Sequence, residues 1–135
     1  MTSLYLVLYK QAPIFPQNTA HWALYLENEG AASGTLFHAS KESLAGETRY
    51  KYATGTKARQ SKNLRSAILV KSGTQLTFGL LHPICKATAQ GRPFDLVVNN
   101  CQRFCSEILV KLVNSGHISA ADFANLKNKG FTPLF

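Results

Sequence analysis

The sequence predicts an α+β fold, with an antiparallel sheet of about four to six strands built mainly by the first half of the chain. Apolar residues alternate along several short segments before residue 72, which is typical of strands. After residue 74 they recur every three or four positions, which is typical of amphipathic helices. With 135 residues, of which 45% are apolar, we expect a single domain spanning residues 1–135.

Alternation and turn residues place the strands of this sheet. We expect strands at 3–10, 21–28, 35–40, 50–54 and 66–71, the fourth of them a short edge strand. Pro13 and Pro16 predict an extended loop, because proline lacks a ladder donor. Residues 29–34 are rich in Gly, Ala and Ser and predict the turn of an antiparallel hairpin. Residues 55–63 are polar and basic, and we expect them to be mobile.

The second half predicts three helices. Leu76, Leu80 and Ile84 form one stripe of a helix that starts near residue 74 and ends near residue 91. Pro83 interrupts that stripe, so we expect a kink there or a split into two shorter helices. Residues 94–98 predict a short extended approach to the second helix, which runs from Cys101 to Gly116. A capping pair, Ser119 with Asp122, opens a third helix that ends near residue 128.

The charge is unevenly distributed along the chain. Of its net charge of +8, nine Lys or Arg residues lie between Thr48 and Phe94, where no Asp or Glu occurs. We expect the 49–92 segment to form a cationic face that attracts an anionic partner: nucleic acid, an anionic membrane surface or an acidic substrate. The alternative is a solvated surface that keeps the protein soluble. The sequence carries no signature of a nucleic-acid-binding module.

The cysteines and the hydropathy pattern predict the cellular compartment of the protein. Three cysteines, Cys85, Cys101 and Cys105, are an odd number without the spacing of a disulfide framework, so we expect reduced thiols. No run of about eighteen apolar residues occurs, and the start of the chain alternates without a basic leader. We therefore expect a cytoplasmic protein without an integral membrane segment.

Cys101 is the strongest candidate for a reactive group. It follows Asn99 and Asn100, which are typical helix-capping residues, and it precedes an apolar-periodic stretch. A helix N-terminus presents unpaired N–H groups and partial positive charge, which can lower the pKa of a thiol and favour the nucleophilic thiolate. Asn100 and Gln102 flank this thiol and are candidate pocket-lining residues.

A nucleophilic thiol needs a base, and four histidines are available. His82 adjoins the proline in a helix and His117 follows a helix end, so neither is expected to act. His21 and His38 lie on the two strands of the predicted hairpin. A two-residue turn at Glu29–Gly30 would set them directly opposite each other, and a looser turn would set them on a diagonal.

Other readings of these residues stay open. Tyr25 shares the strand face of His21 and is a further candidate pocket-lining residue. Cys105 is expected to pack in the core, one helical turn from Cys101. The set His21, His38, Cys101 and Cys105 could instead bind zinc, although a Cys-x-x-x-Cys pair on one helix is not the usual knuckle spacing. A catalytically inactive domain that binds a partner through its basic residues is the remaining alternative.

Several motifs of the chain resemble those of a known family. His-Trp-Ala-Leu-Tyr, then Leu-Phe-His-Ala-Ser and, much later, Pro-Phe-Asp-Leu-Val before Asn-Asn-Cys-Gln-Arg-Phe are similar to motifs of the permuted papain-like (NlpC-type) cysteine enzymes. The lecithin:retinol acyltransferase-like group is the nearest in appearance, and the PPPDE-type peptidases are related. The histidine strands precede the cysteine helix here, which is the permuted order. The resemblance spans roughly residues 21–112, with motifs only at its two ends.

The resemblance implies a permuted papain-like fold, with the sheet packed against the Cys101 helix and one or two further helices. It implies that Cys101 is the nucleophile, His21 the general base and His38 the residue that orients the base, with no cofactor. The expected activity is acyl transfer through a thioester from an amide, ester or thioester of a small molecule or peptide. The alternative is a PPPDE-type peptidase or isopeptidase. Gln102 and Arg103 depart from the Cys-Glu-His order common in the acyltransferase group.

Overall fold

The protein has an α+β architecture with one antiparallel sheet. The computed structural model describes residues 1–9, 21–31, 33–41, 48–62, 64–90 and 101–129. Five strands form the sheet in the order β4-β3-β2-β1-β5, and every neighbouring pair is antiparallel. The strands are β1 (Thr2–Tyr9), β2 (His21–Asn28), β3 (Gly34–Lys41), β4 (Thr48–Thr56) and β5 (Leu64–Thr74). The expected strands are confirmed, and β4 is an edge strand, although longer than predicted.

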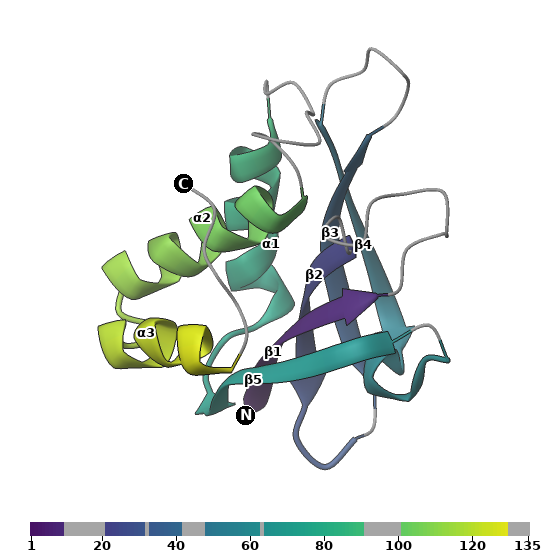
Figure 1. Cartoon of the computed structure of the whole chain (residues 1–135), viewed down its shortest axis with the longest axis horizontal. Helices are drawn as coiled ribbons and strands as arrows, with labels where there is room; N and C mark the ends of the chain where they lie inside the picture. Colours follow the sequence, from purple (N-terminus) through teal and green to yellow (C-terminus); the bar gives the residue numbers. More distant parts are fainter. Residues whose placement is uncertain (10–20, 32, 42–47, 63, 91–100, 130–135) are drawn as a thin grey trace.

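Three helices lie against one face of this sheet (Figure 1). They are α1 (Phe78–Ala89), α2 (Cys101–Asn114) and α3 (Ala120–Asn128). The predicted capping box of α3 is present, because the Ser119 hydroxyl accepts from the Asp122 N–H and the Asp122 carboxylate accepts from the Ser119 N–H. The extended approach expected at residues 94–98 and the loop expected around Pro13 and Pro16 lie outside the described residues.

Helix α1 corrects one expectation, its start, and excludes one of two alternatives, the split at Pro83. It begins at Phe78 rather than near residue 74, because β5 continues to Thr74 and the Thr77 hydroxyl caps the helix by accepting from the Leu80 N–H. It also runs through Pro83 to Ala89 as one helix and is not split. A proline removes one internal hydrogen bond, and the burial of Leu81 and Cys85 against the sheet offsets this loss.

The two faces of the sheet are packed differently. On the helix-covered face, even-numbered residues of β1 and β2 join Phe37 and Ala39 in one large apolar core with the three helices. The opposite face, here called the outer face, carries a smaller cluster of Val7, Ala23, Tyr25 and Ala58. Ala58 belongs to η1 (Ala58–Gln60), a short 3-10 helix between β4 and β5. The expected mobile segment 55–63 thus contains the end of β4 and a helical turn that packs on the outer face.

The β2–β3 hairpin has a looser turn than two residues. Leu24 is paired with Phe37 and Glu27 with Gly34, and Gly30 adopts a positive φ of 81° within the turn. Continuing this register sets position 38 opposite position 23, so positions 21 and 38 are not directly opposed. They lie on a diagonal, about 7–8 Å apart between backbones. The diagonal expected for a looser turn is therefore confirmed, and the direct opposition expected for a two-residue turn is wrong, because more residues separate the two strands.

None of the helices in the described part of the chain combines the length and the apolar character needed to span a bilayer.

Candidate functional site

Cys101 is the first residue of α2, as its sequence context predicts. Its backbone therefore lies in the first turn of a helix of 14 residues, where N–H groups lack helical partners and the helix dipole is positive. The side chains of Cys101 and Gln102, and the whole of Asn100, lie outside the described residues. The position is thus suited to an activated thiol and to an oxyanion donor.

The first turn of α2 packs at one end of the sheet. Phe104 is fully buried, and its ring centroid lies 6.2 Å from that of Tyr50. Tyr50 is paired with Ala39 near the end of β3. Because β2 and β3 are antiparallel, the end of β3 is also the end at which β2 begins. The Cys101 turn therefore lies at the end of the sheet where β2 starts.

His21 is the residue that starts β2, and its backbone is paired with Tyr9 of β1. Its side chain lies outside the described residues. Position 21 is thus at the rim of the sheet, at the same end as the first turn of α2. The structure brings these two sequence-predicted positions to one region of the fold although they are far apart in sequence.

His38 lies on the outer face of the sheet. Its strand neighbours Phe37 and Ala39 point into the helix-covered core, whereas Leu36, in phase with His38, packs against the outer cluster. Burial, and then the positive charge of Lys51 on β4, lower the pKa of His38 below its ordinary value of 6.5. His38 is therefore held toward its neutral form, on the face that α2 does not contact.

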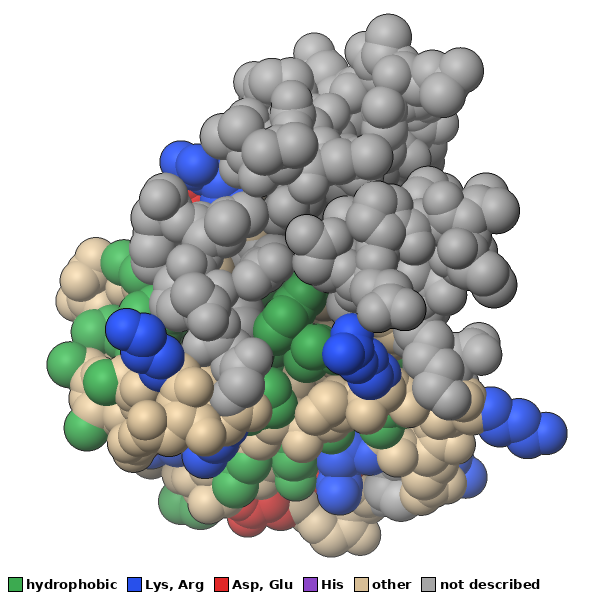
Figure 2. Space-filling model, viewed as in Figure 1, with side chains coloured by type: hydrophobic (Ala, Val, Ile, Leu, Met, Phe, Trp, Pro, Cys, Tyr) green, Lys and Arg blue, Asp and Glu red, His purple; other side chains and the backbone are tan. Residues whose placement is uncertain are grey.

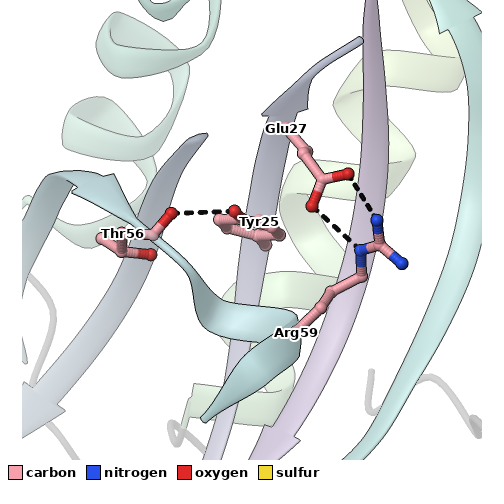
Figure 3. A network of polar contacts seen from close by, with 4 residues as sticks. All are labelled: Tyr25, Glu27, Thr56 and Arg59. Carbon is pink, nitrogen blue, oxygen red and sulfur yellow. Dashed lines mark hydrogen bonds and ion pairs between the residues drawn. The ribbon is translucent and has the colours of Figure 1, made fainter. Parts of the chain in front are cut away.

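Tyr25 is fully buried on the outer face and fixes the strands there. Its hydroxyl donates to the Thr56 carbonyl at 2.9 Å, and burial raises its pKa. Beside it, Arg59 of η1 binds the Glu27 carboxylate through two hydrogen bonds of 2.9 and 2.6 Å (Figure 3). Tyr25 thus belongs to a partly buried polar network that attaches η1 and β4 to β2.

The two described cysteines are core residues. Cys105 and Cys85 are thiols outside any disulfide, and both are fully buried on the helix-covered face. Burial raises the pKa of Cys85 to about 12, so its thiol stays protonated. Cys105 and His38 lie on opposite faces of the sheet and cannot bind one metal ion. Within the described ranges no group of three or more His, Cys, Asp or Glu side chains is placed to hold one.

A Tyr–His pair on the helix-covered side was missed from the sequence. The Tyr50 hydroxyl lies 2.9 Å from Nδ1 of His82, a histidine that we did not expect to act because it adjoins Pro83 in a helix. Burial raises the pKa of Tyr50, so the phenol stays protonated. A cavity of about 670 Å³ opens beside this pair, between β4 and α1. Two spacings in the sequence could have indicated this cluster. Tyr50 and Tyr52 are two residues apart on a strand and share a face, and Phe78 and His82 are four apart on a helix and share a side.

The described basic residues of the 49–92 segment lie on several elements and do not form one continuous cationic face. They are spread over β4, η1, β5 and α1, and β4 and β5 are the two opposite edges of the sheet. Arg59 pairs with Glu27, and Lys71 lies 3.7 Å from the Asp122 carboxylate. Figure 2 shows Lys and Arg side chains in several separate places on the described surface in this view. These basic residues are close together in the sequence but lie apart in the fold.

Comparisons of the chain with protein-family models, with curated proteins and with solved structures found no match. Two places in the fold therefore bear on function. They are the end of the sheet where α2 and β2 begin, and the adjacent cavity beside Tyr50 and His82.

Proposed function

We propose that the protein is a cysteine-dependent acyl-transfer enzyme of the permuted papain-like type, with Cys101 as its nucleophile. One observation carries the proposal: Cys101 begins α2 at the same end of the sheet at which His21 begins β2. A helix-activated thiol needs a base within reach, and a histidine at this end of the sheet supports the pairing. The order of the two motifs along the chain, with the histidine strand first, is the permuted one.

The reaction begins with proton transfer from the Cys101 thiol to His21. The thiolate attacks the carbonyl carbon of an amide, ester or thioester, and a C–S bond forms as the carbonyl electrons move to oxygen. The backbone N–H of Cys101, at the helix start, donates to the resulting oxyanion. The intermediate collapses, and the bond to the leaving amine, alcohol or thiol breaks while His21 protonates that group. A thioester on Cys101 remains.

The second half-reaction releases the acyl group. His21 removes a proton from water, an amine or an alcohol, and the oxygen or nitrogen attacks the thioester carbon. Collapse of the second intermediate breaks the C–S bond and returns the proton to the Cys101 sulfur. With water the enzyme is a hydrolase, and with an amine or alcohol it is an acyltransferase. The same residues serve both outcomes.

His38 is assigned a positioning role in this proposal. Its register puts it on a diagonal from position 21, at a spacing of about 7–8 Å that long side chains can bridge. Its pKa is lowered, so it is a neutral imidazole near pH 7 that can hydrogen-bond without adding charge. Position 21 is in phase with Ala23 and Tyr25, on the outer face that also carries His38, and it lies at the rim of the sheet. In this proposal the base acts on the α2 side around this rim.

Intact-mass spectrometry after brief exposure to iodoacetamide tests the nucleophile. We expect one rapid adduct on the wild type and none on Cys101→Ala. Cys105→Ala is the matched control, because Cys105 lies one turn along the same helix and is fully buried, and it is expected to keep the rapid adduct. Circular dichroism verifies that each variant is folded. Labelling that persists undiminished in Cys101→Ala contradicts the assignment.

A further inference from the structure

The cavity between β4 and α1 has an aromatic wall. The rings of Phe78 and His82 are stacked with centroids 4.9 Å apart, and Tyr52 meets His82 edge-on at 5.1 Å. Tyr52 is nevertheless 49% exposed, and Phe78 is 36% exposed. Tyr50, Tyr52 and His82 line the cavity, and Phe78 stacks on His82 without belonging to the lining. An aromatic side chain as accessible as Tyr52 offers a planar ligand a surface on which to pack.

The polar groups at the same cavity favour an anion. His82 and Lys86 contribute to its lining, whereas none of the described lining residues is Asp or Glu. Lys51 also borders the cavity, but it is paired with His38 and its charge acts on the outer face. The hydrogen bond from Tyr50 to Nδ1 fixes the orientation of the His82 ring and leaves Nε2 as the nitrogen that Tyr50 does not use. In the tautomer in which Nδ1 accepts from the partly buried Tyr50 hydroxyl, Nε2 carries the proton and is a hydrogen-bond donor.

We propose that this cavity binds a small planar aromatic anion, with its ring against Tyr52 and His82 and its anionic group between His82 Nε2 and the Lys86 ammonium. Its volume of about 670 Å³ lies within the range of small-molecule sites. The binding site requires no property of Cys101.

Its position also suggests which substrate the proposed enzyme uses. Tyr50 joins the cavity to the first turn of α2, since its ring contacts both His82 and Phe104. Phe104 follows Cys101 by three residues, which is about one helical turn. The bound anion is then part of the acyl substrate, an inference that rests on the proposed function of Cys101.

Isothermal titration calorimetry with naphthalene-2-carboxylate tests the site on the full chain. We expect saturable binding with one site on the wild type, and weaker binding of the uncharged naphthalene-2-carboxamide. Lys86→Gln is expected to weaken carboxylate binding about tenfold, because it removes a charge-assisted contact. Tyr52→Ala is expected to weaken both probes, because it removes the stacking surface. Lys62→Gln, an exposed lysine outside the cavity, is the matched control and should bind as the wild type does.

The outcomes separate this inference from the proposed function. Absence of saturable binding, or equal affinity in wild type, Lys86→Gln and Tyr52→Ala, overturns the site whatever the reactivity of Cys101. Binding by Cys101→Ala equal to that of the wild type supports a site independent of the thiol. Slower iodoacetamide labelling of Cys101 in the presence of naphthalene-2-carboxylate supports the link to the substrate. An unchanged labelling rate at saturating carboxylate overturns that link.

Discussion

The two faces of the sheet are stabilised by different kinds of interaction. The helix-covered face is held by apolar burial, with Phe104 among the fully buried side chains that α2 contributes. The outer face has only a small apolar cluster. There, η1 and β4 are held to β2 by directed contacts, namely Tyr25 to Thr56 and Arg59 to Glu27. Burial fixes the position of the Cys101 helix, and the polar network fixes the outer face on which His38 lies.

The largest expected effect is on the helix-covered face. Phe104→Ala removes a fully buried ring that joins the first turn of α2 to Tyr50. We expect the free energy of unfolding to fall by about 3–5 kcal/mol, as for other buried Phe-to-Ala changes. Urea unfolding measures this loss. Phe104→Leu, which keeps most of the apolar volume, is the milder control, and a loss below about 1 kcal/mol in Phe104→Ala would show that α2 is not anchored there.

A smaller effect is expected on the outer face. Tyr25→Phe keeps the buried ring but removes the hydroxyl that donates to Thr56 at 2.9 Å. The free energy of unfolding should fall by about 1 kcal/mol, the usual net contribution of one hydrogen bond. The same urea measurement on Tyr52→Phe, in which the altered side chain is 49% exposed, should show little change. Equal effects of the two substitutions would contradict the described network.

The smallest effect is a pH dependence from His38. Burial and the charge of Lys51 lower its pKa in the folded state below 6.5, so the unfolded chain binds the proton more readily. The contribution of this residue is therefore fully present above about pH 6.5 and is lost as the pH falls toward the lowered folded pKa. Urea unfolding near pH 8 and near pH 5.5 should show a smaller difference for His38→Gln than for the wild type. Equal differences in the two proteins would refute this contribution.

The strands were predictable from the sequence because each carries its own alternation. Residues 21–28 form β2 with the predicted bounds, and the capping pair Ser119 and Asp122 marked the start of α3. These signals are local, so neighbouring residues are sufficient to determine them. The observed β2–β3 register, in which position 38 is opposite position 23 instead of position 21, was not predictable, because it depends on the conformation of the turn that contains Gly30.

The candidate site was predictable only in part, because it depends on which face the helices cover. β3 carries apolar side chains on both faces, Leu36 on one and Phe37 on the other, so the alternation alone does not tell which face His38 shares. The Tyr50–His82 pair joins residues 32 apart in sequence and forms only when α1 docks beside β4. Long-range docking of this kind leaves no local pattern in the sequence.

The most direct test of the central claim is the pH dependence of the rate at which iodoacetamide alkylates Cys101, followed by intact mass in the wild type and in His21→Ala. A thiol at a helix N-terminus with a histidine base should react with an apparent pKa well below about 8.5, the value of a free cysteine. In His21→Ala this apparent pKa should rise toward the free value while α2 stays folded. Superimposable profiles centred near that value in both proteins would contradict the pairing of Cys101 with His21.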